Sequence, residues 1–199
     1  MGNLHRIITK EEFNEQWRAI HDRIFTDRIP PERPFRPSHW EMLVFPEMFR
    51  ENETLFHAIT PIAKQLGDRE LVVFVWEILD ESIPMVTMAW NYQALKEFER
   101  TVIQGGFETH LFGQSEKWGI YSSSQHFVTY VGGEPGFMDT VASALGGRSV
   151  IRKEFLEYAT NWEIREGEVA QAAIKNMQAI VKSVGWDWPE EGSEETQHK

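Results

Sequence analysis

The stretch that decides the fold is FETHLFGQSEKWGIYSSSQHFVTYVGG, residues 107–133. Three runs rich in β-branched and aromatic residues lie within it, over 107–113, 117–123 and 126–131, and such runs favour strands. No more than four residues separate one run from the next. Because a parallel pair needs a crossover of a dozen or more residues, these gaps predict antiparallel neighbours.

Two more strands are predicted upstream of this stretch. The sequence ELVVFVWEIL at 70–79 holds three valines and two aromatic residues, and IPMVTMAW at 83–90 has a similar character. The short acidic connection between them is typical of a hairpin. Five strands are therefore predicted within 70–131.

Helical patterns lie on both sides of the strands. The sequences TKEE at 9–12 and SHWE at 38–41 are capping boxes, which predict a helix over 10–25 and a short helix over 38–45. A further helix is expected to start at Asn52 or Thr54, and Thr60 followed by Pro61 reads as another N-cap and first turn. The remaining predicted helices cover 91–104, 137–145, 150–162 and 166–184.

Strands grouped together, with helices before and after them, are typical of the α+β class. We expect an antiparallel sheet of about five strands, packed on one face by the N- and C-terminal helices. Residues 1–188 form one domain in this prediction, and the acidic segment 189–199 is expected to be a disordered tail. The proline-rich run 27–37 excludes a helix and is expected to be a stiff surface connector.

Composition narrows the classes of function. The chain of 199 residues has a net charge of −11 and no cysteine. Nucleic acid is not an expected partner, because its binding needs Lys and Arg to displace counterions, whereas a basic protein would be attracted. Without cysteine there is no disulfide, thiolate nucleophile or cysteine zinc site. The chain lacks a long apolar run and an apolar signal segment, so we expect a cytoplasmic protein with no membrane partner.

The polar candidates for a site lie along the predicted strands of 107–131. His110 and His126 lie on neighbouring strands and would form a site with Tyr121 and Ser122 if their side chains converged. None of the seven histidines has the HxH, HxxxH or HExxH spacing of a metal pair, so no metal or cofactor is expected. Ser122 lacks the G-x-S-x-G context of a nucleophile elbow, and its serine-rich surroundings read more simply as a turn.

Glycines and aromatic residues supply the other candidates. The sequence VGGEPG at 131–136 has no phosphate-loop spacing and is read as the turn that enters a helix. Trp118 is a candidate binding residue, and so are Trp186 and Trp188, which follow the last predicted helix. These two tryptophans are expected to fold back as an anchor, or else to lie at an interface.

The pattern WGIYS at 118–122, followed by a glycine pair and a helix that carries Phe137, resembles a pattern in small uncharacterised bacterial proteins, including some that neutralise toxins. The resemblance covers about thirty residues and implies no particular site residue.

Three functions fit these observations. The leading hypothesis is a non-enzymatic module that binds a basic protein through an acidic and aromatic surface, with toxin neutralisation as one concrete form. The second is an enzyme or small-ligand binder with a pocket near the strands of 107–131. The third is a structural homo-oligomer with an interface formed by an edge strand or by Trp186 and Trp188.

Overall fold

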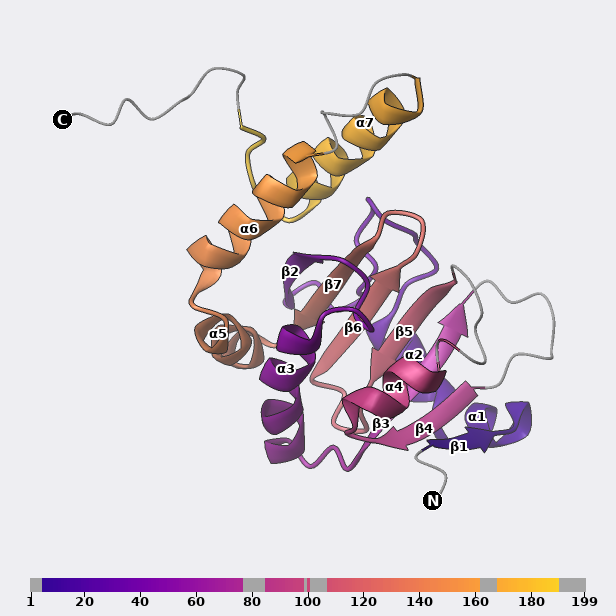
Figure 1. Cartoon of the computed structure of the whole chain (residues 1–199). Helices are drawn as coiled ribbons and strands as arrows, with labels where there is room; N and C mark the ends of the chain where they lie inside the picture. The colour runs from indigo at the N-terminus through magenta and orange to yellow at the C-terminus, as the bar shows by residue number, and fades with distance from the viewer. Residues whose placement is uncertain (1–4, 77–84, 99, 101–106, 162–167, 190–199) are drawn as a thin grey trace.

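The three strand runs of 107–133 become consecutive neighbours in an antiparallel sheet (Figure 1). The computed structural model describes residues 5–76, 85–98, 100, 107–161 and 168–189. Within these residues seven strands pair in the order β1-β4-β3-β5-β6-β7-β2. Their bounds are β1 (His5–Ile8), β2 (Glu41–Pro46), β3 (Glu70–Trp76), β4 (Met85–Ala89), β5 (Glu108–Phe112), β6 (Trp118–Ser123) and β7 (Val128–Gly133). The α+β class and all five predicted strands are confirmed.

The two strands that the sequence did not reveal form the edges of the sheet. Strand β1 pairs with β4, and strand β2 pairs with β7, so both edges come from the N-terminal part of the chain. The helix predicted over 38–45 is wrong, because β2 occupies most of it. Leu43 and Phe45 face one apolar layer and Val44 faces the other. Since both faces are covered, β2 lacks the polar alternation that marks a half-exposed strand. The sequence SHWE at 38–41 has the residues of a capping box, but no helix follows it.

The described helices mostly begin where their caps predict. They are α1 (Lys10–Gln16), α2 (Arg18–Ile24), α3 (Glu53–Gln65), α4 (Tyr92–Phe98), α5 (Pro135–Ala144), α6 (Arg148–Thr160) and α7 (Glu168–Ser183). Thr9 accepts a hydrogen bond from the Glu12 amide, as its capping box predicts. The predicted helix 10–25 is instead two helices that break at Trp17. The predicted connection at 80–82 and the ends of the helices near 104 and 162 fall outside the described residues.

Helix α3 starts at its Asn52 cap, whose side chain accepts a hydrogen bond from the Leu55 amide. The second helix start predicted at Thr60 is wrong, because Pro61 lies inside α3. The Thr60 hydroxyl donates to the carbonyl of Phe56 in the preceding turn. A proline removes one helical hydrogen bond, and the buried face of α3 continues across it regardless.

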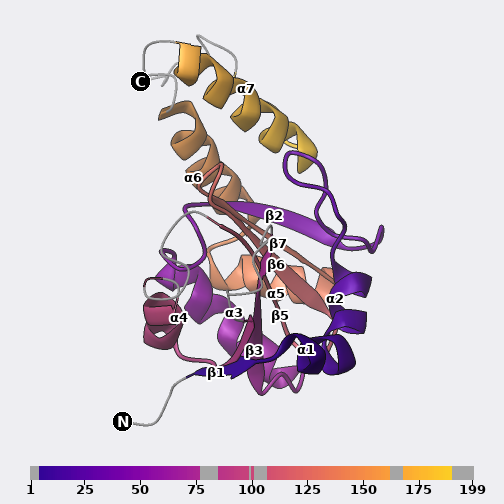
Figure 2. The same cartoon turned by 90° about the vertical axis from the view of Figure 1, so that its right-hand side faces the viewer.

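Helices cover both faces of the sheet. Figure 2 shows α3 and α4 on one side and α1 and α2 on the other. The layer of α1 and α2 also receives α6 and α7, through side chains such as Phe155 and Ile180. The N- and C-terminal helices therefore share one face, as predicted. The opposite face, which was predicted to be open, is covered by α3, α4 and α5 through side chains such as Phe56, Leu95 and Phe137.

The glycine pair 132–133 belongs to strand β7 rather than to the turn that was predicted. The ring of Phe35 lies against Gly132, where an added Cβ atom would come within 2.4 Å of it. Phe35 is a buried residue near the C-terminal end of the proline-rich run, and it pairs with Phe25 through an isolated β-bridge. The run is thus tied into the core at one end, because only glycine in the strand lets the ring approach.

Two further predictions concern the C-terminal tail and the absence of a membrane span. The predicted tail 189–199 lies outside the described residues except for Pro189. Among the described helices, none combines the length and the apolar character that a membrane span requires.

The contact at Gly132 can be tested by adding one methyl group. We expect Gly132→Ala to lower the free energy of unfolding by about 1–3 kcal/mol, because it forces the Phe35 ring away from the sheet. The matched control is Gly136→Ala in the first turn of α5, where a Cβ atom meets nothing within 4 Å. Urea denaturation measures the free energy of unfolding of both variants. Equal stability of the two variants would show that the Phe35 ring moves aside without a loss of stability.

Candidate functional site

A row of polar side chains crosses the centre of the sheet on the face that carries α2. His110, Tyr121 and Tyr130 are directly opposed on β5, β6 and β7. The rings of His110 and Tyr121 lie 4.9 Å apart. Each of the three residues is at most 1% exposed. The structure thus brings the predicted pair His110 and Tyr121 together, in the core of the protein.

The partner of His110 is His21 on α2, which sequence reasoning missed. His21 Nε2 and His110 Nδ1 are 2.8 Å apart, and His21 Nδ1 lies 3.0 Å from a carboxylate oxygen of Asp22. A carboxylate only accepts, so His21 carries its proton on Nδ1, and its Nε2 accepts the Nδ1 proton of His110. No local pattern announces this pair, because 89 positions separate the two histidines.

Burial keeps both members of this pair neutral. It lowers the pKa of His110 well below its ordinary value, and the nearby His21 lowers it further. Burial also lowers the pKa of His21, against the opposing effect of Asp22. Aromatic rings surround the pair, with Phe25 stacked 4.2 Å from His110 and Phe74 4.6 Å from His21. In the same row, burial raises the pKa of the Tyr130 phenol.

His126 and Ser122 do not join this row. His126 lies in the β6–β7 turn, not in a strand, where burial lowers its pKa and the Pro30 backbone opposes that effect. Ser122 faces the opposite layer, where its hydroxyl accepts a hydrogen bond from the amide of Phe49 at 3.0 Å. The convergence of His110 with His126 and Ser122, on which the hypothesis of an enzyme or small-ligand binder depends, is therefore not found in the described contacts.

The three tryptophans that were candidate binding residues all pack against other parts of the protein. Trp118 is fully buried, and its indole N–H donates to the carboxylate of Asp68 at 2.7 Å. The same carboxylate accepts from the amide and the hydroxyl of Ser115. Trp186 and Trp188 pack against the layer of α6 and α7, so both fold back as expected. Asp68 was missed because a lone aspartate after a helix has no distinctive signal.

Glu108 is a second buried carboxylate, and it organises the β6–β7 turn. Its Oε1 accepts hydrogen bonds from the Gln125 amide and the Ser123 hydroxyl, both at 3.1 Å. The Ser123 oxygen in turn accepts from the His126 amide at 3.2 Å. These bonds fix the backbone of the β6–β7 turn as far as His126, which directly precedes Phe127.

Two exposed residues with left-handed backbone lie at this end of the sheet. Phe127 has a φ angle of 52° and Glu47 has a φ angle of 67°. The β2–β7 register ends where Pro46 pairs with Val128, so Glu47 and Phe127 occupy the next positions on the two strands. We call these two residues the two-turn surface. Phe127 is 46% exposed, and Glu47 is also exposed.

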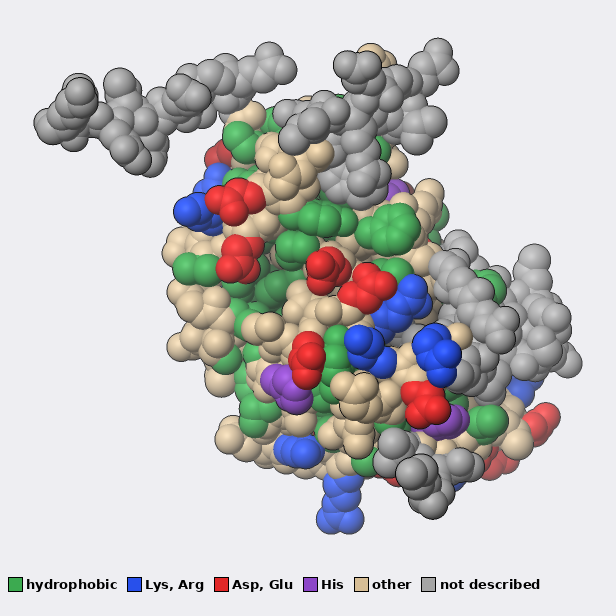
Figure 3. Space-filling view, in the orientation of Figure 1, with side chains coloured by type: hydrophobic (Ala, Val, Ile, Leu, Met, Phe, Trp, Pro, Cys, Tyr) green, Lys and Arg blue, Asp and Glu red, His purple; other side chains and the backbone are tan. Residues whose placement is uncertain are grey.

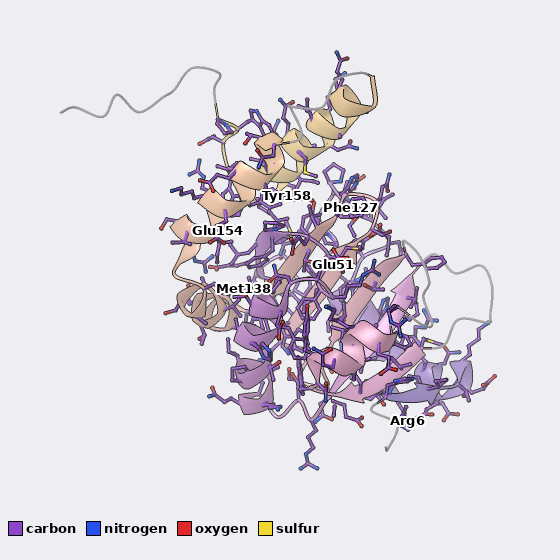
Figure 4. All side chains as sticks on the ribbon, viewed as in Figure 1. Arg6, Glu51, Phe127, Met138, Glu154 and Tyr158 are labelled. Atoms are coloured by element: carbon purple, nitrogen blue, oxygen red, sulfur yellow. The ribbon has the colours of Figure 1, made fainter. Side chains whose placement is uncertain are left out.

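Hydrogen bonds from three directions hold the two-turn surface in place. The Thr129 hydroxyl donates to the Glu47 carbonyl at 2.9 Å, and the Ser122 hydroxyl anchors the residues just after it. The Tyr158 hydroxyl of α6 donates to the Phe127 carbonyl at 2.9 Å, and Figure 4 shows both residues at the same end of the sheet. The predicted site residue Ser122 thus acts as a support for this surface.

A third residue with left-handed backbone has a side chain that is accounted for by a contact within the protein. Glu116 has a φ angle of 60°, and both of its carboxylate oxygens accept from the Arg23 guanidinium at 2.6 Å. That bidentate pair accounts for the side chain at this position. Phe127 makes no aromatic contact with any described residue, so nothing comparable accounts for its ring.

A metal is not supported by the described side chains. No group of three or more His, Asp or Glu residues among them is arranged to hold an ion. The 2.8 Å between the nitrogens of His21 and His110 is a hydrogen-bond distance, and a metal between two imidazoles would need about 2 Å to each nitrogen.

The histidine pair predicts how stability responds to acid. Both histidines have a lower pKa in the folded state than the 6.5 of the unfolded chain. The unfolded state therefore binds more protons, so stability is fully present above pH 6.5 and falls as the pH drops below it. Each group contributes at most about 1.4 kcal/mol per pH unit.

Urea denaturation at pH 7.5 and pH 5.5 measures this loss. We expect His110→Phe to lose less stability on acidification than the parent protein does, because one buried imidazole is gone. His57→Gln is the control, since its side chain is 63% exposed. An unchanged acid response in His110→Phe would show that other groups cause it.

The chain matches no protein-family model, no curated protein and no solved structure. Its functional interpretation therefore depends on the geometry of its own residues. The row of His110, Tyr121 and Tyr130 is buried. The two-turn surface is exposed, and its two residues have a backbone conformation that residues other than glycine do not favour. Of the two, the surface is the feature available to another molecule.

Proposed function

We propose that the protein is a cytoplasmic, non-enzymatic binding module that engages a basic protein through the two-turn surface. The observation that carries this proposal is Phe127, an exposed aromatic residue with left-handed backbone. Left-handed backbone costs a residue other than glycine about 1–2 kcal/mol. Asn or Gly would fit this turn with less strain, so the ring supports a role outside the fold.

The chemistry of the surface suits a basic partner. An exposed aromatic ring supplies the buried anchor that dominates binding energy at many interfaces. The neighbouring Glu47 carboxylate makes no ion pair with a described residue, and is therefore available to a Lys or Arg of the partner. A cation beside the ring would gain further from the negative face of the aromatic system.

The net charge of −11 supports faster association with a basic partner, because it steers the encounter. On the face that Figure 3 shows, acidic and basic side chains are interspersed rather than gathered in one block. We infer that the ring determines where the partner binds, and that net charge acts mainly on the rate. Neutralisation of a toxin with a basic cleft is one concrete form of this function.

The burial of His110 and Tyr121 supports binding over catalysis. A general acid or base must reach the group whose proton it moves. The described fold covers both side chains with α2 and with the aromatic residues around it.

Substitution of Phe127 separates the folding role of the ring from its binding role. We expect Phe127→Asn to keep or raise the free energy of unfolding, by up to about 1 kcal/mol, because Asn tolerates left-handed backbone. The same variant should lose a partner that the parent chain retains from native lysate at low salt, as measured by quantitative mass spectrometry.

Leu66→Ala is the matched control for this capture, since Leu66 is an exposed apolar residue of similar accessibility, at 40%. It should retain the partner. The proposal fails if Phe127→Asn unfolds at lower urea than the parent chain, which would make the ring structural. It also fails if Phe127→Asn retains the same proteins.

A further inference from the structure

An open groove runs along α6, and none of its lining residues belongs to the two-turn surface. It has a volume of about 500 Å³ and is lined by one face of α6, from Ser149 to Thr160, and by Pro189. Another face of the same helix is buried, with Ile151 and Phe155 in the core. The groove therefore uses the side of α6 that the core leaves open.

The groove combines an apolar side chain, Leu156, with two cations, Arg152 and Lys153. Each cation lies near one carboxylate of the described residues: Arg152 is 3.9 Å from Asp187, and Lys153 is 3.8 Å from Glu157. Neither contact is short enough for a hydrogen bond. The guanidinium and ammonium donors are therefore suited to further carboxylates that approach more closely.

The chain itself leads into this groove. The ring of Trp186, which follows α7, lies 6.0 Å from the ring of Phe155 on α6. Pro189, the last residue that the structure describes, lines the groove. The ten residues of the segment 190–199, EGSEETQHK preceded by a further glutamate, follow directly. This segment thus begins at the groove.

The segment 190–199 has the charge and the length to occupy the groove. It contains four glutamates and one lysine, so its charge is opposite to that of Arg152 and Lys153. The helix face from Ser149 to Thr160 is about 16 Å long, and ten extended residues reach up to about 33 Å. Because the segment is joined to Pro189, its local concentration at the groove is about millimolar without any added ligand.

We propose that residues 190–199 dock in this groove as an extended acidic strap, with glutamate side chains on Arg152 and Lys153 and with the chain covering Leu156. Exposed ion pairs of this kind are individually weak, and the covalent connection at Pro189 makes them sufficient. The composition of the segment gives it no core of its own, so any order that it has comes from the groove. The inference does not depend on the proposed function.

The absence of cysteine from the chain allows a single nitroxide spin label to be placed in the strap through Ser193→Cys. The readout is the paramagnetic broadening of ¹⁵N-labelled amide resonances of the full chain. We expect the amides on the groove face of α6, from Ser149 to Thr160, to be broadened more than the covalent connection alone would cause.

The matched control has the same label and the same connection but no glutamate in the strap. It carries Glu190→Gln, Glu191→Gln, Glu194→Gln and Glu195→Gln. Broadening of the α6 amides should be about two- to fivefold weaker in this control, which is the range for one or two exposed ion pairs.

A charge swap identifies the cations that hold the strap. The double variant Arg152→Glu and Lys153→Glu should weaken the broadening to a similar extent, and lysine at the four glutamate positions of the strap should restore it. Lys64→Glu reverses an exposed charge on α3 and should leave the broadening unchanged. Urea denaturation checks that each variant is folded.

Two results would overturn the proposal. The first is equal broadening of the α6 amides with the glutamate and the glutamine strap, which would attribute it to the covalent connection alone. The second is broadening in a mixture of ¹⁵N-labelled chains with separate spin-labelled chains, which would place the strap on a second copy. Either result leaves the capture experiment on Phe127 unaffected.

Discussion

The buried carboxylate of Glu108 determines the shape of one end of this molecule. A carboxylate away from water must be satisfied by hydrogen bonds, and Glu108 obtains them from the amide of Gln125 and the hydroxyl of Ser123. Those bonds set the path of the β6–β7 turn, and the turn leaves Phe127 with left-handed backbone. The hydrogen bonds that the buried Glu108 carboxylate requires thus lead to an exposed aromatic ring at Phe127.

Asp68 has the same relation to the other end of the sheet. Its carboxylate binds Ser115 and Trp118 in the β5–β6 region, while its backbone carbonyl accepts from the indole of Trp90. A single residue after α3 thus connects that helix to the β5–β6 region and to the residue that follows β4. Both carboxylates are structural in their own contacts.

The sequence predicts the parts of this fold that depend on local chemistry. The strands of 70–131 are recognised from β-branched and aromatic runs with short gaps, and Asn52 marks the start of α3 through its side-chain cap. Strand β2 was missed because its apolar residues face two layers at once, so neither period of alternation is visible. Pro61 was misread because the packed face of α3 continues past a residue that would end an isolated helix.

The candidate site was predictable only in part, for a related reason. His110 and Tyr121 are two strand residues whose proximity follows from the register of neighbours. The partner of His110 lies on α2, and the partner of Trp118 follows α3, so both depend on tertiary packing across the chain. The exposure of Phe127 depends on a backbone angle, which a phenylalanine in the sequence does not indicate.

The placement of both edge strands in the N-terminal part of the chain has a consequence for biosynthesis. Strand β1 pairs with β4, and β2 pairs with β7, which ends at Gly133. During translation the N-terminal residues leave the ribosome first, so β2 waits for most of the chain before its partner exists. Through that interval its apolar residues, among them Leu43 and Phe45, are without their layers and are open to chaperones. Among the described strand pairings, β2–β7 therefore joins a segment to a partner that is synthesised long after it.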